Sequence, residues 1–116
     1  VWVDAIRHMD DARASRLVAP SRGTHVVVDH DFYSSDAALI IPKTSDGRVL
    51  FAVPWMGRVI LGTTDTLEDD LPLEPRPTRQ DVDFILSTAA NYLAKPPGHN
   101  DVRSAWAGLR PLVKHA

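Results

Sequence analysis

Apolar side chains near the start of the chain recur at the spacing of a helix. The positions that share one helical face within residues 2–17 are Trp2, Ala5, Ile6, Met9 and Ala12. This pattern is interrupted at Pro20, Ser21 and Gly23, and the β-branched run that follows predicts a strand over residues 25–28. We therefore expect a helix, a break in regular structure and then a short strand.

Three further apolar runs with short connections predict an antiparallel meander. They cover residues 37–41, 49–53 and 59–61, with turn residues at 45–47 and at Met56-Gly57. These runs contain few polar positions, so we expect both faces of the sheet to be at least partly covered. A fifth strand is expected over residues 102–109, and its Trp106 is expected in the core or at an interface rather than as a stacking platform.

A second helix is predicted after an acidic, proline-rich loop at residues 67–77. Thr78 with Asp81 three positions later resembles a capping box, and the apolar positions that follow at helical spacing are Val82, Ile85, Leu86, Ala89 and Leu93. The predicted fold class is therefore α+β. It consists of an antiparallel sheet of about five strands, with an N-terminal helix and one amphipathic helix packed on the sheet.

Composition narrows the classes of function. The 116 residues are 44% hydrophobic and 24% charged, which is typical of one globular domain. The formal net charge of -2 and the lack of a basic run argue against nucleic-acid binding. The absence of cysteine excludes disulfides and thiolate metal sites, and the histidines have no mutual spacing that indicates a metal site.

Polar residues at the ends of the predicted strands are the candidates for chemistry. His25 can accept a proton near neutral pH, Thr63 and Thr64 can donate to a phosphate oxygen, and Arg110 can bind an anion or polarise a carbonyl. Each belongs to a short motif that begins with glycine, at residues 23–25, 62–65 and 108–111. Strand ends are places where a rigid scaffold presents such groups to a ligand.

Each candidate also has a purely structural interpretation. His25 fits an ordinary half-buried histidine, and residues 63–65 fit a turn whose side chains cap backbone groups. Arg110 fits an ion pair with Asp65 or Asp101, because buried charges are usually paired. The residue types by themselves leave both interpretations open.

Five segments, taken in order, resemble the FAD-dependent glycerol-3-phosphate dehydrogenases of the D-amino-acid oxidase and glycine oxidase superfamily. They are RGTHVVV, DGRVLFAVPW, ILGTTDT, RPTRQDVDFILSTAANYL and DVRSAWAGLRPLV. The resemblance implies that residues 1–116 are a single domain, the substrate-binding middle segment of a larger two-domain flavoenzyme. The Rossmann-like FAD-binding domain is expected to be absent here, since no G-x-G-x-x-G motif follows a predicted strand. FAD is therefore expected in the full-length protein and not on this segment, which is expected to be inactive alone.

The resemblance also implies roles for individual residues. His25 and Arg110 are expected to be catalytic, and Thr63, Thr64 and Arg110 are expected to bind the substrate, glycerol 3-phosphate. The implied reaction forms dihydroxyacetone phosphate and passes electrons through FAD to a quinone. A cytoplasmic location peripheral to the inner membrane is expected, and a homo-oligomer is compatible with apolar faces left exposed. The alternatives are another FAD-dependent oxidoreductase of the superfamily, acting on a hydroxy acid or an amine, and a non-catalytic binding or interaction module.

Overall fold

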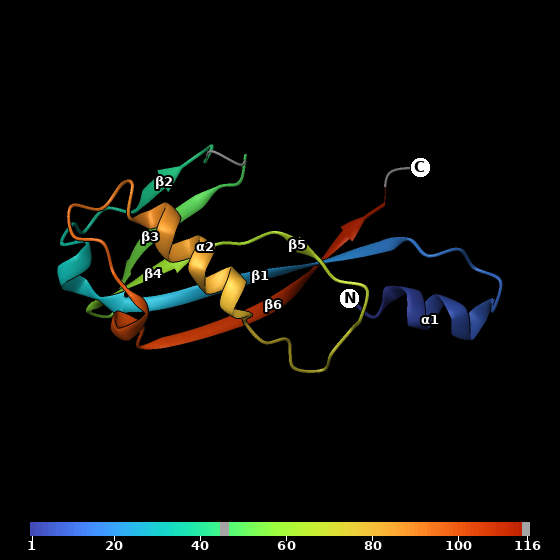
Figure 1. Cartoon of the computed structure of the whole chain (residues 1–116). Helices are drawn as coiled ribbons and strands as arrows, with labels where there is room; N and C mark the ends of the chain where they lie inside the picture. Colours follow the sequence, from blue (N-terminus) through green and yellow to red (C-terminus); the bar gives the residue numbers. More distant parts are fainter. Residues whose placement is uncertain (45–46, 115–116) are drawn as a thin grey trace.

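Two α-helices and a six-stranded antiparallel sheet make up the described part of the chain, residues 1–44 and 47–114, in a computed structural model (Figure 1). In chain order the elements are α1 (Val3–Asp10), β1 (Val18–Asp29), the 3-10 helix η1 (His30–Phe32), β2 (Leu39–Ile41), β3 (Leu50–Trp55), β4 (Arg58–Gly62), β5 (Thr66–Leu67), α2 (Arg79–Ala89), the 3-10 helix η2 (His99–Asp101) and β6 (Ser104–Val113). The predicted α+β class is confirmed, with the short β5 as a sixth strand. Residues 45 and 46 of the predicted turn lie outside the described residues.

β1 is the central strand of the sheet. It pairs with β6 along one edge and with β4 and the short β5 along the other. The predicted meander is formed by β2, β3 and β4 in that order. The β3–β4 turn contains Met56 and Gly57 with φ of 47° and 72°, as a two-residue hairpin turn requires.

β1 begins seven residues earlier than the predicted strand, at Val18 rather than His25. Pro20, Ser21 and Gly23, which interrupt the apolar pattern, lie inside β1 because β6 pairs with this part of the strand. Pro20 lies opposite Pro111, so neither missing N–H is needed between these two strands, and Gly23 lies opposite Gly108. The break expected before residue 25 was therefore wrong.

α1 ends at Asp10, earlier than the predicted helical region that extends to residue 17. The chain folds back because the Asp4 carboxylate accepts hydrogen bonds from the Leu17 and Val18 N–H groups at 2.9–3.0 Å. These backbone donors lower the pKa of Asp4 to about 2. α1 lies at one end of a molecule that measures 53 × 25 × 24 Å, away from the sheet face that α2 covers (Figure 1). Of the two helices, only α2 is packed on the sheet.

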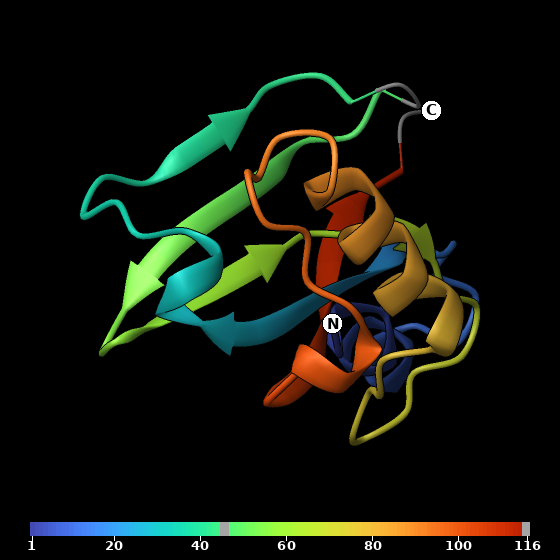
Figure 2. The same cartoon turned by 60° about the vertical axis from the view of Figure 1, so that its left-hand side comes forward.

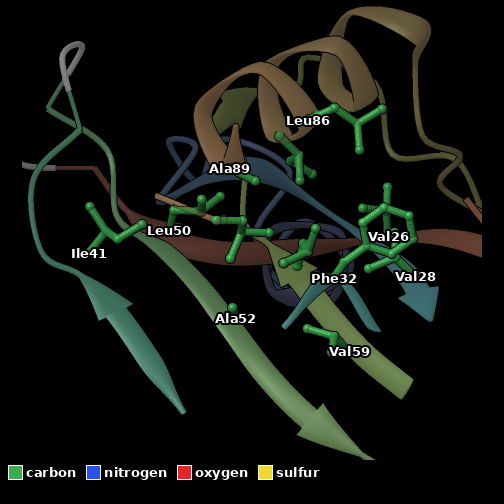
Figure 3. Packing of buried hydrophobic residues seen from close by; sticks show 12 residues of the cluster. Val26, Val28, Phe32, Ile41, Leu50, Ala52, Val59, Leu86 and Ala89 are labelled. Carbon is green, nitrogen blue, oxygen red and sulfur yellow. The ribbon is translucent and has the colours of Figure 1, made fainter. Parts of the chain in front are cut away.

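α2 lies over one face of the sheet (Figure 2), and the hydrophobic core fills the space between them (Figure 3). The Thr78 side chain accepts from the Asp81 N–H and the Asp81 carboxylate accepts from the Thr78 N–H, which confirms the predicted capping box. The buried core residues are Val26, Val28, Phe32, Ile41, Leu50, Ala52, Val59, Leu61, Ile85, Leu86, Ala89 and Leu93. Within the described residues no helix lies on the opposite face, so the expectation that both faces are at least partly covered by other elements stays a prediction for the intact protein.

Candidate functional site

The two faces of the sheet differ in chemistry because side chains alternate along β1. Val26 belongs to the core, and the Thr24 hydroxyl donates to Asp81 of α2 at 3.1 Å, so these side chains face the helix. The alternate residues Gly23 and His25 therefore lie on the opposite, open face. The candidate site is on this face.

β6 brings the second group of candidates to the same face. Directly opposed residues of an antiparallel pair share a face, and β6 places Trp106 opposite His25 and Arg110 opposite Ser21. The guanidinium of Arg110 reaches back along the strand to lie over Gly23, two residues from His25. At about 3.3 Å per residue, the Cα atoms of Gly23 and His25 are roughly 7 Å apart along β1, so the guanidinium lies near the imidazole on this face.

Arg110 is held in one orientation by groups at the end of β4. Its Nη2 donates to Thr63 Oγ1 at 2.7 Å and its Nη1 donates to the Thr64 carbonyl at 3.0 Å, while the Asp65 carboxylate is 3.8 Å away. The guanidinium lies directly on the backbone of Gly23, where an added Cβ would be 2.4 Å from Nη2. Two hydrogen bonds and a glycine beneath therefore fix the plane of the guanidinium.

The expected ion pair of Arg110 is confirmed with Asp65 and not with Asp101. Asp65 is its acidic neighbour, at a distance longer than a hydrogen bond, while the Asp101 carboxylate accepts from the Gly98 N–H at 2.8 Å. Asp65 also accepts a short hydrogen bond from the Ser21 hydroxyl. The Asp65 carboxylate is therefore shared between Ser21 and Arg110. Part of the Arg110 side chain stays exposed on the open face.

His25 lies flat over the neighbouring strand. A Cβ at Gly62 would be 2.4 Å from its Cδ2, so only glycine leaves room for the imidazole in this position. The indole of Trp106 stacks on the ring, with centroids 5.3 Å apart and planes 11° from parallel. Trp106 is therefore not a core residue of this chain, and its expected place at an interface stays a prediction. The pairing of residues 25 and 106 depends on strand register, and no signal in the local sequence indicates it.

The His25 ring is poised to be neutral. Burial lowers the pKa of His25, and the nearby positive charge of Arg110 lowers it further. Its Nδ1 is buried without a hydrogen-bond partner among the described residues. A neutral imidazole has one nitrogen that can accept a proton.

A shallow hollow of about 220 Å³ is bordered by both side chains and includes two glycines in its lining. It is lined by Gly23, His25, Trp106, Gly108, Leu109 and Arg110. Its volume is below the roughly 300–1,000 Å³ of pockets that take drug-sized ligands, so it suits a small substrate. A second hollow of about 520 Å³ shares Arg110 and is also lined by Thr63, Thr64 and Asp65.

The two threonines are used within the chain. The Thr64 side chain is completely buried, and its hydroxyl accepts from the Thr24 N–H at 3.0 Å and donates to the Arg22 carbonyl at 3.3 Å. The Thr63 hydroxyl accepts from Arg110 and donates to the Thr64 carbonyl at 3.2 Å. Both residues support Arg110, Thr63 through its hydroxyl and Thr64 through its carbonyl. Direct contact of either hydroxyl with a substrate stays a prediction.

Comparison with known proteins shows the family of the chain. The family model for FAD dependent oxidoreductases (DAO) matches residues 1–116. The chain belongs to this family. The resemblance inferred from the sequence is thereby confirmed at the level of the family, as is FAD as the cofactor of the family.

The relatives of the chain are much longer proteins. It is 44% identical over 116 residues to a probable mitochondrial glycerol-3-phosphate dehydrogenase of Caenorhabditis elegans, covering 97% of this chain and 16% of that protein. It is 41% identical to the mitochondrial glycerol-3-phosphate dehydrogenase of Homo sapiens, with the same two coverages. The crystal structure of the Bacillus halodurans glycerol-3-phosphate dehydrogenase complexed with FAD superposes with a TM-score of 0.85 at 40% identity, over 97% of this chain and 23% of that chain. The chain therefore spans less than a quarter of these relatives.

The expected location is corrected by the same comparison. A cytoplasmic position peripheral to the inner membrane was expected, whereas the relatives from Caenorhabditis elegans and Homo sapiens are named as mitochondrial enzymes. Neither α1 nor α2 has the length and hydropathy to cross a bilayer, among the residues that the structure describes.

The open face fits a flat cofactor as a neighbour. A Cβ added at Gly108 would meet no heavy atom within 4 Å, so the floor of the hollow opens to free space. The residues that would face FAD are His25, Trp106 and Arg110.

Proposed function

We propose that this chain is the substrate-binding segment of an FAD-dependent glycerol-3-phosphate dehydrogenase. The observation that carries the proposal is that His25 of β1 and Arg110 of β6 border one hollow on the open face of the sheet. The chain that carries them is similar to proteins that are named glycerol-3-phosphate dehydrogenases. The proposed reaction converts glycerol 3-phosphate to dihydroxyacetone phosphate.

His25 is the proton acceptor in this proposal. Oxidation of a secondary alcohol removes the hydroxyl proton and a hydride from the same carbon. FAD, when bound, supplies the hydride acceptor. Because burial and Arg110 keep the imidazole neutral, His25 can take the hydroxyl proton at neutral pH.

Arg110 stabilises the oxygen that loses the proton and orients the substrate. Its guanidinium is fixed by Thr63 and Thr64 before the substrate arrives, so little reorganisation accompanies the reaction. The planar fork also suits the phosphate or the developing carbonyl. We propose that Thr63 contributes a further contact to a phosphate oxygen when its hydroxyl rotates away from the Thr64 carbonyl.

The remaining parts of the proposal concern the whole protein. A quinone is the proposed electron acceptor, and association with a membrane surface is proposed because quinones with long apolar chains reside in the bilayer. A homo-oligomer is the proposed assembly, because the apolar side chains of Trp2, Ile6 and Met9 on α1 are exposed in this chain.

The direct test is the spectrum and turnover of the intact protein. We expect bound FAD whose visible absorbance is bleached by glycerol 3-phosphate without oxygen and restored by a soluble quinone. Flavin that is reduced only by a hydroxy acid or an amine would favour the alternative oxidoreductase. A protein with neither flavin nor oxidation of glycerol 3-phosphate would be the non-catalytic module instead.

A further inference from the structure

We propose that Trp106 is a positioning residue that holds the imidazole of His25 over the hollow. The two residues are direct cross-strand partners, and their rings stack with centroids 5.3 Å apart and planes 11° from parallel. This inference rests on the proposed function, because it concerns the proton acceptor of that reaction.

The usual means of orienting such a histidine is missing from the described chain. A histidine that transfers protons is commonly held through its second ring nitrogen by a carboxylate or a carbonyl. Here the buried Nδ1 has no hydrogen-bond partner among the described residues. The side chain of His25 is therefore oriented by packing and not by a hydrogen bond.

Trp106 is the packing partner that can do this. On the other side of His25 the neighbouring strand provides Gly62, whose backbone supports the ring but offers no side chain to restrain it. The indole covers one face of the imidazole, and a flat aromatic partner favours a parallel plane where an aliphatic side chain would not. Loss of the indole would let His25 leave the orientation that faces the hollow.

Trp106 is not placed as a core residue. Its side chain is 43% exposed and lies on the open face, away from the cluster under α2. It also lines the hollow together with His25 and Arg110. A residue that only stabilised the fold would be expected in the buried cluster.

Turnover of the intact protein with two substitutions tests the role. Trp106→Leu should lower kcat for glycerol 3-phosphate roughly tenfold, with KM changed less than about twofold, because the base is misplaced while the binding groups remain. Trp106→Phe keeps an aromatic face and should restore most of kcat. In a His25→Ala background, Trp106→Leu should cause no further loss, because the group that it positions is gone.

A chemical measurement reports on His25 without using activity. Diethyl pyrocarbonate modifies neutral imidazoles, and tryptic cleavage releases residues 23–43, which contain both His25 and His30. In the intact protein, with or without its flavin, Trp106→Leu should increase the modification rate of His25 severalfold. His30 is the internal reference and should keep its rate, and Trp106→Phe should label His25 at the wild-type rate.

The outcomes separate this inference from the proposed function. Unchanged oxidation in His25→Ala would overturn the proposed function, whatever the labelling shows. A loss of turnover in His25→Ala, combined with normal kcat and unchanged His25 labelling in Trp106→Leu, would overturn the positioning role alone. An equal further loss from Trp106→Leu in the His25→Ala background would also overturn it.

Discussion

At the scale of single residues, one glycine determines how close Arg110 lies to the sheet. The guanidinium occupies the space where a side chain at Gly23 would project, at 2.4 Å from the added Cβ. The far end of a flexible side chain can move aside, so a substitution here would displace the guanidinium and leave the strand intact.

Gly23→Ala should therefore mimic a loss of Arg110. We expect kcat/KM for glycerol 3-phosphate to fall about tenfold in the intact protein, with a normal thermal unfolding temperature. The control is the same substitution in an Arg110→Ala background, where it should add little. Independent, additive losses would mean that Gly23 does not act through Arg110.

Arg110→Lys keeps the positive charge and removes the planar fork. A lysine cannot hydrogen-bond to Thr63 and Thr64 in the same arrangement while facing the hollow, so we expect kcat/KM to fall roughly 10- to 100-fold. Arg58→Lys is the matched control, since Arg58 pairs with Asp29 on an exposed edge and should leave turnover unchanged. Normal kinetics in Arg110→Lys would remove this residue from the site.

The pH profile should also depend on Arg110. The reaction needs neutral His25, whose pKa is lowered by burial and by the charge of Arg110. The acidic limb of kcat/KM should therefore lie below the ordinary histidine value of about 6.5. Arg110→Gln removes the charge and should move this limb to higher pH. A limb that stays in place would show that a different group titrates.

At the scale of elements, features fixed by neighbouring residues could be predicted and features fixed by distant strands could not. The capping box of Thr78 and Asp81 depends on residues three positions apart, and it was predicted correctly. The start of β1 depends on Pro111 and Gly108, which lie opposite Pro20 and Gly23 but about ninety residues later in the chain. The proline and glycine near the start of β1 therefore predicted a break, whereas pairing with β6 holds these residues in a strand.

Asp81 joins α2 to the central strand. It completes the capping box and accepts hydrogen bonds from Arg22 and Thr24 of β1. Burial by itself raises the pKa of Asp81, but the hydrogen bonds from Thr78, Arg22 and Thr24 outweigh it and hold the pKa below its ordinary value. The ionised carboxylate is therefore stabilising.

Asp81→Ala should lower the free energy of unfolding by about 3 kcal/mol, because it removes a helix cap and leaves a partly buried arginine without one of its acids. Gln80→Ala, at the adjacent exposed position, should change the free energy of unfolding by less than about 0.5 kcal/mol.

The stability that Asp81 contributes should also depend on pH. It is present above the ordinary aspartate pKa of about 3.9 and is lost as pH falls through the lowered pKa. Urea unfolding of the intact protein at several pH values measures the loss of unfolding free energy in each variant and its dependence on pH. Equal stability of the two variants would contradict this role.

At the scale of the whole molecule, the sheet separates stability from chemistry. The face under α2 holds the core, and the open face holds His25, Trp106 and Arg110. The sequence indicated His25 and Arg110 as candidates because both were expected at strand ends. That placement was wrong, since His25 lies inside β1 and Arg110 lies inside β6, which extends to Val113. Their meeting at one site was expected from the resemblance alone, because the β1–β6 register that brings them and Trp106 to one face is not visible in the local sequence. The family assignment extends over the whole chain but over less than a quarter of its relatives, so completion of the site belongs to the intact protein.

The most direct test of the central claim is a crystal structure of the intact protein with FAD and glycerol 3-phosphate. We predict the substrate in the hollow above Gly23 and Gly108, with its secondary hydroxyl within about 3.2 Å of a ring nitrogen of His25 and an oxygen in reach of the Arg110 guanidinium. A substrate bound away from this face, or a His25 ring that has no path to the hydroxyl, would contradict the account.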